Sequence, residues 1–159
     1  MRILIVSDTH RHIDDFEKVY MRVLPIDLVV HCGDAELSEE AFKRIIGCPL
    51  MMVSGNNDFF ADLPREIEFM IGRYKVWLLH GHNYYVTVEG KTIRREAERR
   101  NADIVIYGHT HKPIIDIMPE LIAVNPGSLC YPRQEGRRPS FIIMEIDKEG
   151  EAHFTINYL

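Results

Sequence analysis

Short apolar runs alternate with amphipathic stretches in the first third of the chain. Residues 2–7, 26–31 and 50–54 are largely apolar, the pattern of strands that are buried on both faces. Residues 14–23 and 38–46 instead place apolar side chains three or four positions apart, which indicates helices with one buried face. Aspartates at the start of the first stretch and a serine at the start of the second suit helix caps. The alternation predicts a parallel sheet covered by helices.

The pattern changes after Asp58. Residues 66–71 and 74–79 flank a Gly-Arg pair and predict a β-hairpin, and the charged stretch 87–100 predicts a helix with a solvated face. Further strands are expected at residues 103–107, 113–118, 121–124, 140–146 and 152–158. Because no repeat or flexible linker interrupts the chain, we expect one domain over residues 1–159 with a mixed parallel and antiparallel sheet arrangement.

Composition narrows the class of protein. The chain has 159 residues, of which 46% are hydrophobic and 27% charged, as in an ordinary globular domain with a core of its own. A net charge of −5 argues against strong electrostatic binding of nucleic acid, which requires a basic surface. A substrate phosphate held through a metal ion remains compatible with this charge.

Cysteine usage and the N-terminal region indicate a cytoplasmic protein. The three cysteines, an odd number at wide spacing, predict neither a disulfide framework nor a Cys-x-x-Cys site. The apolar run at residues 3–6 is too short for a signal peptide, and no segment approaches the length needed to cross a bilayer. We therefore expect no membrane association.

Polar side chains follow five of the predicted strands, at the points where the strands end. The five clusters are Asp8-Thr9-His10, Gly33-Asp34, Gly55-Asn56-Asn57-Asp58, His80-Gly81-His82 and Gly108-His109-Thr110-His111. One such cluster is weak evidence for a functional site. Five clusters are hard to explain as ordinary loop residues, because polar groups near buried strands cost free energy unless a hydrogen bond or a bound ion satisfies them. Ligands of open α/β sheets bind outside the carboxyl ends of the strands, so the clusters can converge. Carboxylates and imidazoles suit Mn²⁺, Fe²⁺, Zn²⁺ or Ni²⁺.

In order and approximate spacing, these clusters resemble the motifs of the calcineurin-like metallophosphoesterase family. The short length, the two histidine clusters and the segment Asn125-Pro126-Gly127-Ser128 resemble the small bacterial and archaeal phosphodiesterase branch, which is similar in fold to the retromer scaffold subunit. The matching motifs span residues 8–133. The resemblance implies an α/β fold, a two-sheet αββα sandwich of mixed parallel and antiparallel strands.

The resemblance also implies a dinuclear metal centre with Asp34 as the bridging ligand. One ion would be held by Asp8, His10, Asp34 and His111, and the other by Asp34, Asn56, His80 and His109. We expect two divalent cations, with Mn²⁺ preferred and Ni²⁺, Fe²⁺ or Zn²⁺ as alternatives. Such a pair can activate a bridging hydroxide for direct attack on phosphorus. The expected activity is therefore hydrolysis of a small phosphoester, with a diester preferred over a monoester.

Other residues receive roles from the same resemblance. Catalysis is assigned to Asp34, Asn56, Asp58 and His82, with Asp58 expected to orient a neighbouring ligand or loop and His82 to lie behind the ligand His80. Substrate contacts are assigned to His12, Asn57, Ser128 and Arg133. For His12 and Arg133, simple exposure to solvent is an equally open interpretation.

Residue 57 departs from the family pattern. Many family members carry a histidine there, beside the substrate, that assists the leaving group. An asparagine amide can donate a hydrogen bond but cannot give up a proton at ordinary pH. We therefore expect weak assistance to poor leaving groups, with His12 or His82 left as alternative proton donors.

Two other functions compete with catalysis. A protein-binding scaffold on the same fold would require a sizeable exposed apolar patch and feeble turnover. A nucleotide-binding α/β module is disfavoured because neither G-x-G-x-x-G nor G-x-x-x-x-G-K-[ST] follows a predicted strand. Retention of every proposed metal ligand favours the enzyme, and the sequence leaves a homo-oligomer open.

Overall fold

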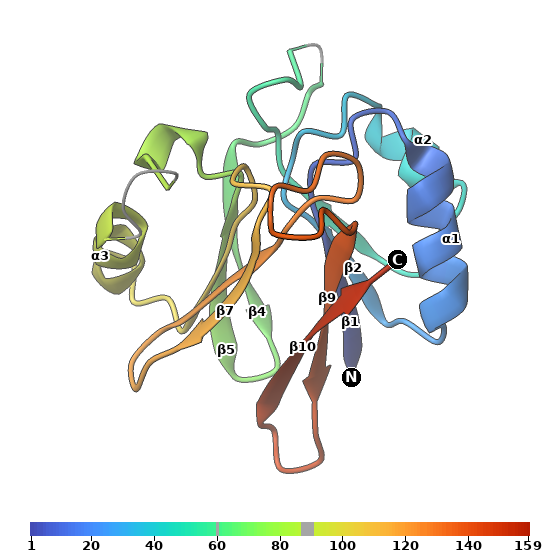
Figure 1. The fold of residues 1–159 in the computed structure, drawn as a ribbon. Coiled ribbons are helices and arrows are strands. Elements are labelled where there is room, and N and C mark those ends of the chain that lie inside the picture. Colours follow the sequence, from blue (N-terminus) through green and yellow to red (C-terminus); the bar gives the residue numbers. More distant parts are fainter. Residues whose placement is uncertain (60, 87–90) are drawn as a thin grey trace.

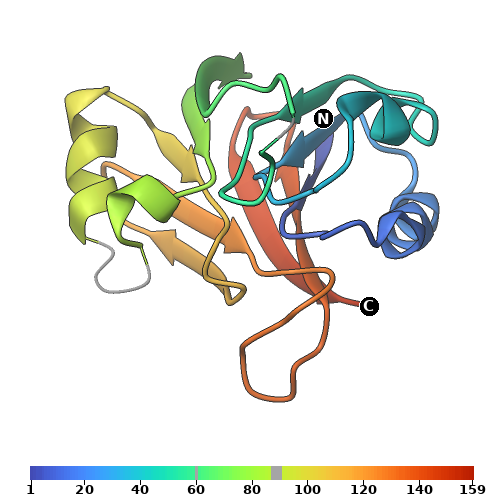
Figure 2. The same ribbon diagram turned by 90° about the horizontal axis from the view of Figure 1, so that it is seen from above.

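The computed structural model describes residues 1–59, 61–86 and 91–159. Two five-stranded sheets face each other, and helices cover both outer faces (Figure 1). Helices α1 (Ile13–Val23) and α2 (Glu39–Lys43) lie on one side, and α3 (Lys91–Arg99) lies on the other, as the view from above also shows (Figure 2). The expected αββα sandwich of mixed sheets is confirmed.

The first sheet has the order β10-β9-β1-β2-β3. Its strands are β1 (Arg2–Val6), β2 (Leu28–His31), β3 (Leu50–Met52), β9 (Ser140–Ile146) and β10 (Ala152–Tyr158). Strands β1, β2 and β3 run parallel, whereas β9 is antiparallel to both β1 and β10. Strand β1 is therefore central, with one neighbour close in sequence and one far away.

The second sheet has the order β4-β5-β6-β8-β7. Its strands are β4 (Glu66–Ile71), β5 (Tyr74–Leu79), β6 (Ile104–Ile106), β7 (Pro113–Ile117) and β8 (Ile122–Pro126). Strands β5, β6 and β8 are parallel, while β4 and β7 pair antiparallel at the two edges. The predicted hairpin between β4 and β5 is confirmed, with Gly72 at a φ of 56° in its turn.

Alternate residues of β1 enter two different cores. Ile3 and Ile5 pack between the sheets with residues of both, such as Val30 and Leu78. Leu4 and neighbouring side chains pack outward against the buried face of α1. Burial on both faces explains why residues 3–6 of β1 form a continuous apolar run in the sequence.

The ends of several elements differ from the sequence prediction. Helix α1 begins at Ile13 with His12 at its N-cap, so Asp14 and Asp15 lie in its first turn and do not cap it. Helix α2 has Ser38 at its N-cap without a side-chain capping bond. Carboxylates in the first turn of α1 still favour the helix through its dipole.

Several elements are shorter than the sequence predicted. Strand β3 is confined to Leu50–Met52, because the chain leaves the sheet early to form the loop that follows. Strand β2, Leu28–His31, ends where it was expected to end but begins after the predicted residue 26. The described part of the predicted 87–100 helix begins at Lys91, and residues 87–90 lie outside the described residues. Among the described residues, no helix is long and apolar enough to cross a membrane.

The arrangement of the strands positions the polar clusters. Strands β1, β2 and β3 end at the same edge of their sheet, and β5 and β6 end together in the other sheet. Each of these five strands runs into one of the five polar clusters. The clusters therefore gather above one end of the sandwich.

Candidate metal centre

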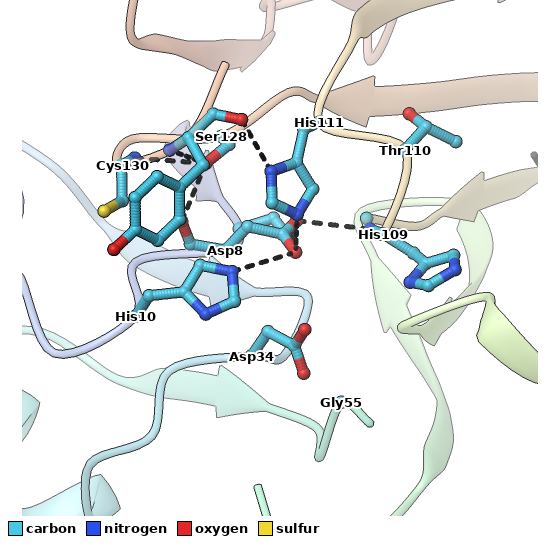
Figure 3. Close-up of polar contacts among 12 residues, drawn as sticks. Asp8, His10, Asp34, Gly55, His109, Thr110, His111, Ser128 and Cys130 are labelled. Carbon is cyan, nitrogen blue, oxygen red and sulfur yellow. Dashed lines mark hydrogen bonds and ion pairs between the residues drawn. The ribbon is translucent and has the colours of Figure 1, made fainter. Parts of the chain in front are cut away.

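The carboxylate of Asp8 lies at the centre of the gathered loops (Figure 3). Its Oδ2 accepts hydrogen bonds from the Ser7 hydroxyl at 2.6 Å and from the backbone N–H of His109 at 3.2 Å. Its Oδ1 is buried and has no hydrogen-bond partner among the described residues. Burial would raise the pKa of Asp8, but the nearby His111 and His80 rings and Ser7 together lower it, so the group is a carboxylate.

A second buried carboxylate, Asp34, stands beside the first. The backbone N–H of Asn57 donates to its Oδ1 at 2.7 Å, and the Asn57 side-chain amide donates to its Oδ2 at 2.6 Å. Nε2 of His80 lies 3.4 Å from the same Oδ2. Burial alone would raise the pKa of Asp34, yet His80 and Asn57 outweigh it and hold the pKa well below its ordinary value.

Three histidines are oriented in the same way, each through its Nδ1 atom. The acceptors are Oε1 of Glu36 for His10 at 2.7 Å, the Cys32 carbonyl for His80 at 2.8 Å, and the Tyr131 carbonyl for His111 at 2.6 Å. Because an acceptor faces each Nδ1, that atom carries the proton, and Nε2 of the neutral ring presents a lone pair. This arrangement is typical of histidines that bind metal through Nε2.

The Nε2 atoms that carry these lone pairs lie close to the two carboxylates. Nε2 of His111 lies 3.0 Å from Asp8 Oδ1, and the buried Nε2 of His10, 3.9 Å from the same oxygen, has no hydrogen-bond partner among the described residues. Nε2 of His80 lies 3.1 Å from the side-chain oxygen of Asn56. Electron-rich atoms that face one another in a buried site require a cation between them. The residues therefore fit a divalent metal ion.

In the metal-free chain a proton competes for the same position. Burial would lower the pKa of His80, but the carboxylates of Asp34 and Asp8 together outweigh it and raise the pKa. A divalent cation supplies more positive charge at the same place. The electrostatics of the site thus favour cation binding.

In the part of the chain that the structure describes, the ligand atoms form two clusters, and within each cluster all atoms lie within 4.8 Å of one another. One contains Asp8, His10 and His111, and the other contains Asp8, Asp34 and His80. Asp8 is common to both, whereas the sequence analysis assigned the bridging role to Asp34; the bridge by Asp34 stays a prediction.

Residue His109 belongs to neither cluster. Its ring points away from the Asp8 carboxylate (Figure 3), and the centres of the His109 and His80 rings are 5.1 Å apart. Binding of metal by His109 stays a prediction that requires its ring to turn towards His80.

The backbone around the site is unusually constrained. Among the described residues, ten non-glycine residues have positive φ, and five of them are proposed ligands: Asp8, His10, Asp34, His109 and His111. A Cβ atom on Gly55 would lie 2.1 Å from Asp34 Oδ1, and one on Gly108 would lie 2.0 Å from the Ser7 hydroxyl. Strained backbone and close loop contacts of this kind are concentrated at functional sites.

The model of the calcineurin-like phosphoesterase superfamily domain matches residues 1–149. The chain belongs to this family. A probable metallophosphoesterase of Bacillus subtilis is 30% identical over 150 residues, covering 94% of this chain and 86% of the relative. A phosphodiesterase of Methanocaldococcus jannaschii is 28% identical over 148 residues, covering 82% of this chain and 85% of the relative.

Solved structures agree with this assignment. A predicted phosphoesterase from Streptococcus pneumoniae superposes with a TM-score of 0.83 at 28% identity, covering 99% of this chain and 88% of that one. Vacuolar Protein Sorting 29 from Cryptosporidium parvum superposes with a TM-score of 0.77 at 20% identity, covering 99% and 97% of the two chains. At that identity the second likeness concerns the fold alone.

Within this calcineurin-like phosphoesterase, Asp58 holds a loop in place. Its carboxylate accepts backbone N–H groups from Asp34 at 2.7 Å, Glu36 at 2.6 Å and Gly55 at 2.8 Å. The same carboxylate thus fixes the loop after β2 to the loop after β3. The bond from the Asp34 N–H holds the backbone of that residue, and Asp58 itself belongs to neither group of ligand atoms found among the described residues.

His82 follows β5 in a short 3-10 helix, His82–Tyr84. The centre of its ring is 5.4 Å from that of His80 and 6.2 Å from that of His109. Its Nδ1 is buried without a hydrogen-bond partner among the described residues, and burial together with His80 lowers its pKa. His82 therefore lies beside His80 and His109, and its expected place behind the ligand His80 stays a prediction.

The four residues proposed to contact substrate occupy different environments. His12 and Arg133 are exposed, and the His12 ring stands edge-on to Tyr131 at 6.1 Å. Asn57 is partly buried and bound to Asp34. Ser128 is buried; its hydroxyl donates to the Asp8 carbonyl at 2.8 Å, which favours a positioning role over substrate contact. Substrate contact by these residues stays a prediction.

Sequence reasoning missed two supporting residues. Glu36, two residues after Asp34, orients His10. His31 is fully buried at the end of β2, where its Nδ1 accepts from the Gly33 N–H at 3.1 Å and its Nε2 faces the Thr9 hydroxyl at 3.1 Å. Burial lowers the pKa of His31 to about 4, so the ring is neutral. It joins the loop that carries Asp8 and His10 to the one that carries Asp34.

Proposed function

We propose that this protein is a phosphodiesterase that works with two divalent cations at the candidate metal centre. The observation that carries the proposal is a pair of buried atoms, Oδ1 of Asp8 and Nε2 of His10, that have no hydrogen-bond partner among the residues described and lie among the facing lone pairs of the site. Two bound cations would supply an activated water and neutralise charge on the phosphate and the departing oxygen.

The chain's own residues would hold and orient this chemistry. Asp8 and Asp34 provide the negative charge, and their low pKa values keep them ionised at neutral pH. Glu36 and two backbone carbonyls fix the histidine rings before any ligand arrives. A site that is already ordered needs little rearrangement on binding, which favours both affinity and rate.

Preference for a diester over a monoester is supported by two arguments. The small phosphodiesterase branch shares the motifs of this chain, and the Methanocaldococcus jannaschii relative is a phosphodiesterase. Mn²⁺ is our preferred metal, since the oxygen and nitrogen ligands suit it. The substrate is proposed to be a small phosphoester in the cytoplasm.

The deciding experiment uses protein stripped with a chelator and reloaded separately with Mn²⁺, Ni²⁺, Fe²⁺, Zn²⁺ or Mg²⁺. Hydrolysis of bis(p-nitrophenyl) phosphate is compared with that of p-nitrophenyl phosphate. We expect metal-dependent turnover with a higher kcat/KM for the diester, and its loss in Asp34→Asn. A higher kcat/KM for the monoester would overturn the diester preference, and equal turnover without metal would overturn the proposal.

The scaffold alternative has less support. Large exposed apolar side chains on the described edge strands are Met70 on β4 and Ile114 and Ile117 on β7. These strands are opposite edges of one sheet, so the side chains do not form one patch. A binding protein also has no need for oriented histidines and buried carboxylates, so we favour catalysis.

A further inference from the structure

A cavity of about 490 Å³ lies beside the metal centre, lined on one side by residues 36–40 and on the other by residues 57–59 and 61–63. Its volume is in the range of cavities that hold small organic molecules. None of the proposed metal ligands lines it, so the cavity is a neighbour of the metal centre and not the centre itself.

Two lining residues connect the cavity to the ligands. Glu36 contacts His10 at 2.7 Å, and the Asn57 amide donates to Asp34 at 2.6 Å. Glu36 and Asn57 therefore border both the cavity and the metal centre. An ester group that extends past these two residues from a phosphate at the centre would enter the cavity.

Part of the lining is apolar. Leu37, Leu63 and Phe59 contribute to it, and Phe59 is 79% exposed. An aromatic ring that is left open to solvent beside a cavity can cover an apolar group or the face of an organic cation.

The charged part of the lining is mostly negative. The described acids that line the cavity are Glu36, Glu39, Glu40, Asp58 and Asp62, against a single base, Arg11. Arg11 already pairs with Glu36 at 3.1 Å. Asp62 makes no hydrogen bond or ion pair within the described part of the chain. An anionic group would be repelled here, and a cation would be attracted.

We propose that this cavity receives a cationic ester group of the substrate, an alkylammonium with apolar substituents. The inference rests on the proposed function, because it concerns the ester that stays on the phosphate. In the reaction, water adds to phosphorus and the bond to the other ester oxygen breaks. The products are an alcohol and a phosphomonoester that keeps the cationic group.

The test uses three p-nitrophenyl phosphodiesters that share one leaving group. The second ester is choline, its neutral analogue 3,3-dimethylbutanol, or the anionic 4-hydroxybutanoate. With metal-loaded protein we expect kcat/KM for the choline ester to exceed that of the neutral ester by roughly threefold to tenfold, mainly through KM. The anionic ester should be the slowest.

Variants of the lining residues distinguish the effect of charge on kcat/KM from the effect of shape. Asp62→Asn should lower the choline-to-neutral ratio by about twofold to threefold, since it removes one exposed carboxylate. Phe59→Ala should lower kcat/KM for both esters. Glu149→Gln, an exposed residue in the turn between β9 and β10, makes the same change of charge elsewhere and should leave the ratio unchanged.

The outcomes distinguish this inference from the proposed function. Equal kcat/KM for the three diesters, or a ratio unaffected by Asp62→Asn, would overturn the cationic subsite while phosphodiester hydrolysis stands. Absence of hydrolysis of all three diesters with every metal would overturn the proposed function and this inference with it.

Discussion

Asn57 binds Asp34 twice, through its backbone N–H to Oδ1 at 2.7 Å and through its side-chain amide to Oδ2 at 2.6 Å. The amide at this position therefore supports a carboxylate of the metal centre. It has no proton to give to a leaving group. These two hydrogen bonds give Asn57 a supporting role at the position where the family resemblance implies a histidine.

Leaving-group dependence follows from this contact. Charge builds on the departing oxygen, and a general acid that neutralised it would contribute about 10²–10⁴-fold. Without one, rates across a series of aryl and alkyl phosphodiesters should fall steeply as the pKa of the leaving group rises. The slope should flatten in Asn57→His, and Asn57→Ala, which adds no acid, should keep it steep. A shallow slope in the unmodified protein would mean that His12, His82 or a metal-bound water already donates the proton.

Two ions per chain are expected at full loading. The seven proposed ligands exceed what one ion commonly takes from a protein. Elemental analysis at saturation gives the number, and anomalous diffraction gives the positions. A single ion held by Asp8, His10 and His111, with His80 and His109 free, would contradict the dinuclear proposal.

Asp34→Asn should be more damaging than His82→Ala. The first change removes a charge that faces His80 Nε2 at 3.4 Å, whereas the second removes a ring that lies beside the ligands. We expect a loss of about 10–100-fold in kcat for His82→Ala and a larger loss for Asp34→Asn, both measured at saturating metal. Comparable kinetics for the two variants would show that their roles are wrongly assigned.

Glu36 should control metal affinity through His10. Glu36→Ala removes the acceptor that fixes the ring, and the dissociation constant for Mn²⁺, measured by titration calorimetry, should rise about 10–100-fold. Glu17→Ala, on the exposed face of α1, removes an equal charge away from the site and serves as the control. If both variants bind Mn²⁺ as tightly as the unmodified protein, the orientation of His10 does not depend on Glu36.

His31 should make the metal-free protein sensitive to mild acid. Its folded pKa of about 4 lies below the ordinary value of 6.5, so the unfolded chain binds more protons between these values and stability falls with falling pH. The loss between pH 7 and pH 5 should be about 2 kcal/mol from this group. Urea unfolding of the unmodified protein and of His31→Gln at both pH values measures it. An equal loss in the two proteins would assign the effect to other groups.

The sequence predicted those features that depend on local pattern. Residues 3–6, in the strand that leads to Asp8, are apolar and buried on both faces, so the strand is recognisable without its neighbours. The clusters at strand ends could be grouped because parallel strands share an edge. The start of α1 was misplaced because the chain first makes a tight turn through Arg11, which has a φ of 69° and no signal of its own in the sequence.

Contacts between distant segments could not be read in the same way. The Tyr131 carbonyl that orients His111 is a backbone atom, and every residue has one. Its position depends on the loop after β8, which Ser128 ties to Asp8 across 120 residues. The cavity beside the centre likewise depends on how residues 36–40 approach residues 57–59 and 61–63.

The pairing of β1 with β9 affects the order in which the protein can be assembled during synthesis. All seven proposed ligands lie between residues 8 and 111, but the strand that leads into Asp8 obtains its second neighbour from residues 140–146. Until that segment has left the ribosome, the apolar side chains of β1 are only partly covered. The complete set of proposed ligands is therefore synthesised before the strand that completes the sheet around β1.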